Sequence, residues 1–387
     1  MALGPDQAFE IFSHFPATTI FKFRHLSKSF SNLVEETYFV KKQIHNSLEK
    51  DNTCFFLQHE TSQKYNNRVK FYPLPGKQSS SNVFRDVLEF LSYSSKVLAS
   101  TKGLIICRTT SKIPTELFIC NPATKCWLPI PSPVQLQENP DIDLIILLLE
   151  CYNDSDDYMV LHFENPTDWF TSNYACKILK PEEGIWKPME KSFFAGRRSV
   201  KFNMPVHQNG IIHFISDCFP YLTRRSPYFE PYIMSYNLHN GTSKMLKLPQ
   251  NARKVSYDVN CDMGIFNWGK VSTGDSSICL VRLKGSTFKV WILKDYGSNR
   301  WMRILKVRIE DMGLREECPK IKGFTVMNDA LLIFATEKRI HSCGLTNKNY
   351  MKIEKICEHE CKSNVCFTPF LDTLRPCGPE ATTLHLP

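Results

Sequence analysis

Near the start of the chain, apolar residues recur at the spacing of a helix. The first set falls at i, i+3, i+4 and i+7, which is one helical face, and consists of Ala8, Ile11, Phe12 and Phe15. Asp6 stands in the N-cap position of this helix. Pro16 ends it, because proline lacks the amide hydrogen that a continuing helix needs. The pattern therefore predicts a short amphipathic helix before residue 16.

Two further short helices follow in the sequence. Thr18 or Thr19 can cap the second, and Ser27 can cap the third. Their apolar residues are Ile20, Phe21 and Phe23 in the second and Phe30, Leu33, Val34 and Tyr38 in the third. A segment of about forty residues cannot build a sufficient core alone, so we expect these helices to pack on a partner or a second domain.

Beyond residue 50 the pattern changes to short runs of β-branched and aromatic residues separated by Asn, Gly, Pro and Ser. Six units repeat this arrangement, and they span 54–75, 103–131, 158–189, 209–249, 278–304 and 330–356. Their starts lie roughly fifty to seventy residues apart, the spacing of large β-propeller blades. Asn240-Gly241 predicts a type I′ hairpin turn, in which both central residues have positive φ. The alternative that stays open is a β-sandwich or several small sheets.

The longest apolar run, Leu144 to Leu149, lies between Asp143 and Glu150. Six residues are too few to cross a bilayer, so the run predicts a buried strand. Trp127 and Trp301 follow hairpin turns at equivalent places of two units, which predicts that both are core residues.

The first forty residues resemble the F-box of plant F-box proteins. The residues that carry the resemblance are Leu3 and Asp6, Glu10-Ile11-Phe12, Phe15-Pro16, Lys22-Phe23-Arg24, Leu26-Ser27-Lys28-Ser29-Phe30, Leu33-Val34 and Phe39. Two places depart from the pattern: Gly4-Pro5 replaces a proline followed by an acid, and Phe30 replaces a tryptophan. Both changes keep a turn former and a large aromatic ring.

The rest of the chain resembles the F-box-associated domain that follows the F-box in many plant proteins. The matching motifs are Gly103-Leu104, Asn121-Pro122-Ala123-Thr124 with Trp127 and Leu128-Pro129, Asn209-Gly210 with Phe214, and Val290 to Gly297 with Trp301. Each motif is weak alone, but their order behind an F-box is specific. The resemblance implies an α+β multidomain chain: a helical F-box over 1–45, then a mostly-β, propeller-like substrate-binding domain over 46–387.

The resemblance also implies a function. F-box helices dock on a Skp-family adaptor, and the adaptor docks on the cullin and RING subunits of an SCF-type E3 ubiquitin ligase. The chain would then be a non-catalytic substrate receptor without a cofactor. The residues expected to bind the adaptor are Ile11, Phe15, Pro16, Ile20, Phe23, Arg24, Leu26, Lys28, Phe30, Leu33 and Val34. The protein substrate, its binding residues and any requirement for phosphorylation or a small ligand are not identified by the sequence.

Composition limits the other classes of function. The 387 residues include 48 basic and 39 acidic side chains, a formal net charge of +9 that is spread along the chain rather than clustered as in a nucleic-acid-binding protein. We therefore expect neither nucleic acid nor membrane as a partner. No signal-peptide pattern is visible, so we expect reduced thiols for the 15 cysteines and a location in the cytoplasm and/or nucleus.

Few residues point to other chemistry. The densest thiol and imidazole cluster comprises His341, Cys343, Cys357, His359, Cys361, Cys366 and Cys377, but it lacks two tight ligand pairs, so no metal site is predicted. The acidic run 153–157 lacks the glycine and distal glutamate of a calcium loop. Basic residues recur in predicted loops and would bind an acidic or phosphorylated segment if several met: Arg197-Arg198 with Lys201, Arg224-Arg225, Arg253-Lys254, and Arg300 with Arg303.

Two alternative functions stay open. One is an adaptor-independent binding scaffold whose F-box has drifted. The other is a propeller-fold enzyme, although the sequence contains none of the nucleophile-elbow, phosphate-loop or zinc-protease motifs.

Overall fold

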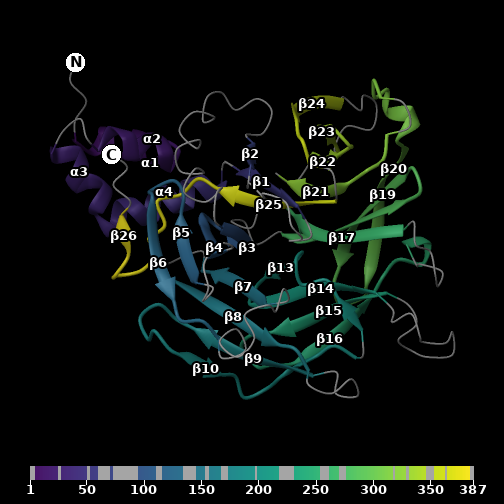
Figure 1. The fold of residues 1–387 in the computed structure, drawn as a ribbon, viewed down its shortest axis with the longest axis horizontal. Coiled ribbons are helices and arrows are strands. Elements are labelled where there is room, and N and C mark those ends of the chain that lie inside the picture. Colours follow the sequence, from purple (N-terminus) through teal and green to yellow (C-terminus); the bar gives the residue numbers. More distant parts are fainter. Residues whose placement is uncertain are drawn as a thin grey trace. The chain divides into compact units, whose positions relative to one another are not determined.

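Figure 1 shows the computed structural model of the chain. It describes residues 5–383 except 25–27, 50–52, 60–69, 73–94, 110–115, 134–144, 153–156, 167–172, 197, 218–230, 253–260, 270–275, 317–318, 328–330, 346–352 and 362–363. The chain divides into two compact units, which we describe separately. The first comprises Met1–His162, Ile178–Lys187 and Ser363–Pro387, and the second comprises Phe163–Lys177 and Pro188–Lys362.

Four helices open the first unit: α1 (Pro5–Ser13), α2 (Ala17–Phe23), α3 (Lys28–Glu35) and α4 (Thr37–Glu49). The three predicted helices are confirmed, but their ends differ. Because α1 begins at Pro5, Asp6 lies inside it and is not its N-cap. Tyr38 belongs to α4, a helix that apolar spacing did not predict and that runs through the predicted domain boundary. Among the described residues, no helix is both long and apolar enough to cross a membrane.

The first unit contains two complete antiparallel sheets. One has the order β2-β1-β25, with β1 (Thr53–His59), β2 (Lys70–Tyr72) and β25 (Val365–Leu371). The other has the order β26-β6-β5-β4-β3, with β3 (Ser95–Thr101), β4 (Leu104–Thr109), β5 (Leu117–Asn121), β6 (Cys126–Ile130) and β26 (Thr382–Thr383). Strands from the end of the chain thus complete sheets that begin near its start.

A third sheet has the order β10-β9-β8-β7, with β11 paired to β9. Its strands are β7 (Ile146–Cys151), β8 (Tyr158–Glu164), β9 (Asn173–Leu179), β10 (Trp186–Pro188) and β11 (Phe193–Phe194). Of the apolar run predicted as a buried strand, Ile146 to Leu149 open β7 and are buried, and Leu144 lies outside the described residues.

The second unit contains three more antiparallel sheets. One has the order β12-β14-β15-β16, with β13 also paired to β14, and consists of β12 (Ser199–Val200), β13 (Val206–Gln208), β14 (Ile211–Asp217), β15 (Tyr232–Asn237) and β16 (Ser243–Lys247). The next is β17 (Cys261–Trp268), β18 (Ser277–Lys284), β19 (Thr287–Asp295) and β20 (Arg300–Arg308). The last is β21 (Gly323–Met327), β22 (Leu331–Ala335), β23 (Arg339–Gly344) and β24 (Ile353–Glu358). Each of the six predicted units therefore supplies two or three strands of one sheet, and strands outside the units complete it.

The predicted type I′ turn lies at a different Asn-Gly pair. Asn209 and Gly210 both have positive φ, 48° and 72°, and they join β13 to β14 as a two-residue hairpin. At the predicted site only Gly241 has positive φ, and its amide donates to the Asn237 carbonyl across a longer turn. The type I′ prediction for Asn240-Gly241 was wrong because β15 ends at Asn237 and β16 begins at Ser243, so the turn is longer than a two-residue loop.

One core of the first unit joins the helices to the sheet of β3–β6. It contains Ala17, Ile20 and Phe39 from the helices together with residues of β3, β4 and β5 and Phe370 of β25. The half-buried Trp127 packs against this cluster and lies edge-on to Phe118, with ring centroids 6.4 Å apart. The N-terminal helices are therefore packed on a second domain, as their length requires.

Trp127 and Trp301 are both packed against cores, but their indole N–H groups differ. Trp301 is half-buried, and its Nε1 donates to the Lys247 carbonyl at 3.1 Å. The Nε1 of Trp127 is buried without a hydrogen-bond partner among the described residues. Only Trp301 thus uses the polar end of its ring.

This difference predicts that replacing each tryptophan with phenylalanine changes the stability by unequal amounts. Trp301→Phe should lower the free energy of unfolding by about 1–2 kcal/mol, because the Lys247 carbonyl loses its donor. Trp127→Phe should change it by less than about 1 kcal/mol, since the removed N–H had no partner to lose. Urea unfolding of the two variants measures both values. Equal losses would show that ring volume, not the hydrogen bond, sets the effect.

Candidate adaptor-binding surface and other candidate sites

The three predicted helices share a small aromatic core. Phe12 of α1 lies edge-on to Phe23 of α2 and to Phe30 of α3, with ring centroids 6.5 and 4.6 Å apart. Phe23 and Phe30 also meet edge-on at 6.1 Å. This geometry is the favourable one for aromatic pairs. Phe30, which takes the place of the usual tryptophan, therefore holds the three helices together.

The residues expected to bind an adaptor lie at different depths. Ile11 is 43% exposed, and Lys28 is also exposed. Half-buried side chains are Phe15, Pro16, Phe23, Arg24, Phe30, Leu33 and Val34. Ile20 is fully buried in the chain's own core, so it supports the helices from within and offers no contact surface. Leu26 lies outside the described residues.

Arg24 lies at the end of α2, and its guanidinium carbon is 3.6 Å from the centroid of the Phe21 ring. Partial withdrawal from water lowers the pKa of Arg24, while Cys126 and Glu35 act in the opposite direction. A stacked guanidinium keeps its charge and loses little entropy on binding, which suits a position beside an apolar surface.

The buried side of the helices is fixed by a segment near the other end of the chain. The Asp372 carboxylate accepts hydrogen bonds from the Thr18 amide at 3.0 Å and from the Thr18 hydroxyl at 2.7 Å. α2 begins at Ala17 and has no local side-chain cap, so Asp372 caps it from 354 residues away. The predicted capping by Thr18 or Thr19 was therefore wrong. A carboxylate at this helix end also complements the helix dipole.

Gln43 of α4 reinforces the same junction. Its amide nitrogen donates to the Phe15 carbonyl at 3.1 Å, and its amide oxygen accepts from the Leu374 amide at 2.9 Å. Gln43 is completely buried, so each of these bonds forms away from water. Helix α4 is thereby tied both to the end of α1 and to the segment after β25.

The same segment is also held by the sheets of the first unit. The Asn121 amide donates at 2.8 Å to the carbonyls of Thr373 and of Arg375. The Arg375 guanidinium, which is 0% exposed, donates to the carbonyls of Tyr152 at 2.9 Å and Asp157 at 3.2 Å. Residues 372–375, which we call the junction segment, thus bind the helices on one side and the sheets on the other.

The thiol and imidazole cluster of the sequence is dispersed by the fold. Cys343 lies in a core of the second unit and Cys377 in a core of the first. His359 bonds the Thr336 carbonyl at 3.0 Å, and His341 bonds Glu316 at 3.2 Å. Within the part of the chain that the structure describes, no three His, Cys, Asp or Glu side chains are placed to hold a metal.

The predicted basic doublets do not form one cluster among the described residues. Arg198 is buried, donates to the Ser216 hydroxyl at 2.6 Å and lies over the Tyr232 ring. Lys201 pairs with Asp262. Arg197, Arg224-Arg225, Arg253-Lys254 and most of the acidic run 153–157 lie outside the described residues.

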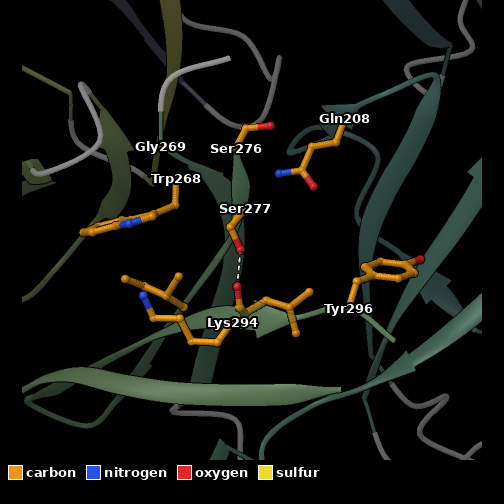
Figure 2. Close-up of a pocket in the computed structure, with 9 residues that line it drawn as sticks. Gln208, Trp268, Gly269, Ser276, Ser277, Lys294 and Tyr296 are labelled. Atoms are coloured by element: carbon orange, nitrogen blue, oxygen red, sulfur yellow. Dashed lines mark hydrogen bonds between the residues drawn. The ribbon is translucent and has the colours of Figure 1, made fainter. Parts of the chain in front are cut away.

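A pocket of about 380 Å³ opens in the second unit at the ends of β17, β18 and β19. Figure 2 shows the rings of Trp268 and Tyr296 on opposite sides of it, with the Gln208 amide turned inward. The Gln208 amide nitrogen is buried without a partner in the described structure. The Ser277 hydroxyl donates to the Leu293 carbonyl. The nine lining residues that the structure describes include no carboxylate, cysteine or histidine, and they present hydrogen-bonding groups and rings.

His213 lies behind Tyr296, with ring centroids 5.7 Å apart, and its Nδ1 is 2.8 Å from the Ser235 hydroxyl. Burial, aided by His207, lowers the pKa of His213 to about 4. The imidazole is therefore neutral at physiological pH and acts here as a packed, hydrogen-bonded side chain.

Comparison with known families agrees with this architecture. The F-box domain family matches residues 8–42, and the F-box associated beta propeller domain family matches residues 43–343. The chain therefore belongs to the F-box proteins that carry an F-box associated beta propeller domain, and its six sheets correspond to six blades. The predicted fold class, F-box helices before a mostly-β propeller, is confirmed. The predicted domain boundary after residue 45 stays a prediction.

Similar proteins come from Arabidopsis thaliana. The F-box protein CPR1 is 22% identical over 85% of this chain and 76% of its own length. The F-box protein At5g49610 is 20% identical over 78% of this chain and 77% of its own length. The putative F-box protein At1g71320 is 30% identical, over 31% of this chain and 32% of its own length.

Proposed function

We propose that this chain is the substrate-recognition subunit of an SCF-type E3 ubiquitin ligase. Its F-box would bind a Skp-family adaptor, and through it the cullin and RING subunits, while the propeller domain binds a protein substrate. The family supports this role, because an F-box implies an adaptor. We expect it to act in the cytoplasm and/or nucleus.

The observation that carries the proposal is the unequal use of the two sides of the helices. One side is buried inside the chain, where Ala17, Ile20 and Phe39 are 0% exposed. Outside this core Ile11 stays 43% exposed, while Phe15 and Val34 are half-buried against the core and Phe23 is half-buried between Phe12 and Phe30. An apolar surface left open on a helix suits a permanent protein partner.

The chain would contribute proximity rather than bond chemistry. The junction segment fixes the helices to the sheets of the first unit by at least six hydrogen bonds. A substrate held by a domain with fixed attachment keeps its lysines near the conjugating enzyme, which raises their effective concentration.

Ile11→Asp should reveal the adaptor surface. Ile11 is exposed, so the variant should melt like the parent, but a charge buried at the interface should weaken adaptor binding by at least about tenfold. Calorimetric titration of the full-length chain with a purified plant Skp-type adaptor measures this. Ile185→Asp is the matched control, because Ile185 is 58% exposed and lies between β9 and β10, outside the helices.

Two outcomes would oppose the proposal. If the parent does not bind the adaptor at all, the adaptor-independent scaffold becomes the better description. If Ile11→Asp binds as tightly as the parent, the adaptor uses a different surface of the helices.

A further inference from the structure

Strand pairing places several basic residues on one face of the sheet β17–β20 in the second unit; Figure 1 shows three of these strands, β17, β19 and β20, as labelled ribbons. Side chains alternate between the two faces of a strand, so the pairing of the strands decides which residues share a face. One face carries the apolar core residues Leu280 and Trp291 at one end. The same face carries Arg303 opposite Trp291 and, towards the other end, Arg282, Lys284, Lys289, Lys306 and Arg308. We call these six residues the basic face.

Three of these charges stand directly opposite one another. Arg282 of β18 pairs with Lys289 of β19, which in turn pairs with Lys306 of β20. Neighbouring strands are about 4.8 Å apart, so this row spans about 10 Å. Partial withdrawal from water lowers the pKa of Lys289, and the nearby Arg282, Lys306, Arg303 and Lys284 lower it further. Like charges directly opposite destabilise a sheet, so the row costs stability in the unbound protein.

Nothing on the described strands of this face neutralises the row. The β17 residues opposite Lys284 and Arg282 are Cys261 and Met263, and the carboxylate of β19 on this face, Asp295, lies at the far end of the strand beyond Trp291 and Leu293, where it pairs with Arg300. Within the described residues, Lys289, Arg303, Lys306 and Arg308 have no ion pair. These four charges are therefore available to an external anion.

The accessible charges lie on an edge strand. Arg303, Lys306 and Arg308 of β20 are exposed, and β20 ends the sheet. Arg282 is 6% exposed and is fixed by bonds to Cys261 Sγ and the Asn251 carbonyl. The corresponding last strand of the next sheet, β24, carries Glu354 and Glu358 beside Lys355. The basic face is thus a property of this sheet, not of every sheet in the repeat.

We propose that the basic face binds an acidic segment of a protein substrate, whose anionic groups are carboxylates or phosphates. This deepens the proposed function and rests on it. Four cations, the half-buried Lys289 and the exposed Arg303, Lys306 and Arg308, lie within a few residues' length of an extended peptide and match a short run of Glu, Asp or phosphoserine. Bases of a single-stranded nucleic acid would need open rings to stack on, whereas on this face Trp291 is 3% exposed and Trp301 is half-buried against the core, with its Nε1 bonded to the Lys247 carbonyl.

The test removes three exposed charges at once. Arg303→Gln, Lys306→Gln and Arg308→Gln are combined in one full-length variant, the face variant. Lys244→Gln, Lys247→Gln and Lys320→Gln form the matched control, because these lysines are also exposed but lie on other elements. The face variant should melt no lower than the parent, since like-charge repulsion is relieved.

Fluorescence anisotropy measures binding of four labelled probes. They are a glutamate-rich peptide of the length of β20, nine residues, its glutamine counterpart, a version with phosphoserines, and an oligothymidylate of equal charge. The glutamate or phosphoserine peptide should bind the parent, and the face variant should bind it about tenfold more weakly, as expected for three rim ion pairs. The control variant and the glutamine peptide should show no such change. The difference between the two anionic peptides identifies the source of the charge.

Three results would overturn the proposal: no binding of either anionic peptide, equal weakening in the control variant, or tighter binding of oligothymidylate than of both peptides. Adaptor titration of the same proteins tests the ligase role separately from the acidic-segment site. Adaptor binding without peptide binding rejects the basic face alone. Peptide binding without adaptor binding rejects the ligase role and leaves the acidic-segment site standing.

Discussion

Replacing Asp372 with alanine should lower the free energy of unfolding by about 3 kcal/mol, because two hydrogen bonds to a buried carboxylate are lost together. Asp372 is 4% exposed, and the amide and hydroxyl of Thr18 would be left without its carboxylate in the interior. Urea unfolding of the full-length chain measures the change. The same variant should keep adaptor affinity near that of the parent, since Asp372 lies on the buried side of the helices.

A double-mutant cycle distinguishes loss of the Asp372–Thr18 interaction from general destabilisation of the fold. Thr18→Val keeps the shape of the side chain and removes only its hydroxyl. If Asp372 acts through Thr18, the double variant should lose about 1–2 kcal/mol less unfolding free energy than the sum of the two single losses. Asp311→Ala is the control for loss of an aspartate, because Asp311 is exposed, and it should stay within about 0.5 kcal/mol of the parent. A loss below about 1 kcal/mol for Asp372→Ala would show that α2 does not depend on this cap.

Local pattern accounts for the elements that could be predicted. Helical spacing located α1, α2 and α3, and the alternation of apolar runs with turn residues located six sheets. The exact turn could not be assigned in this way, because Asn209-Gly210 and Asn240-Gly241 are the same dipeptide. Only the ends of the flanking strands decide which pair takes positive φ at both residues.

The features that sequence missed depend on residues far apart in the chain. No local signal connects Asp372 with Thr18, or shows that β25 pairs with β1. The basic face was also not predicted, because its residues are spread from 282 to 308 and are brought together only by strand register. By contrast, the sequence showed which helix residues are apolar. It did not show which of these residues the rest of the chain buries. Ile20 was therefore assigned to the adaptor surface although it is buried.

Arg375 is the second residue whose loss should have a large effect. It is among the largest fully buried side chains, and its guanidinium donates to the carbonyls of Tyr152 and Asp157. Arg375→Ala leaves both carbonyls without these donors and opens a cavity. We expect the free energy of unfolding to fall by about 4 kcal/mol. Urea unfolding of the full-length chain, compared with the parent, checks this value.

Two further substitutions separate volume from hydrogen bonding. Arg375→Met fills most of the space without donors, so it should cost about 2 kcal/mol, less than alanine. Arg375→Lys keeps the charge, but an ammonium group cannot reproduce the planar fork that reaches two carbonyls, so it should also destabilise the chain. Arg300→Ala, at an exposed position of β20, is the control and should stay within about 0.5 kcal/mol of the parent. If Arg375→Ala proves no worse than Arg300→Ala, the junction segment does not contribute to stability through Arg375, and its attachment to the sheets must rest on Asn121 and the backbone alone.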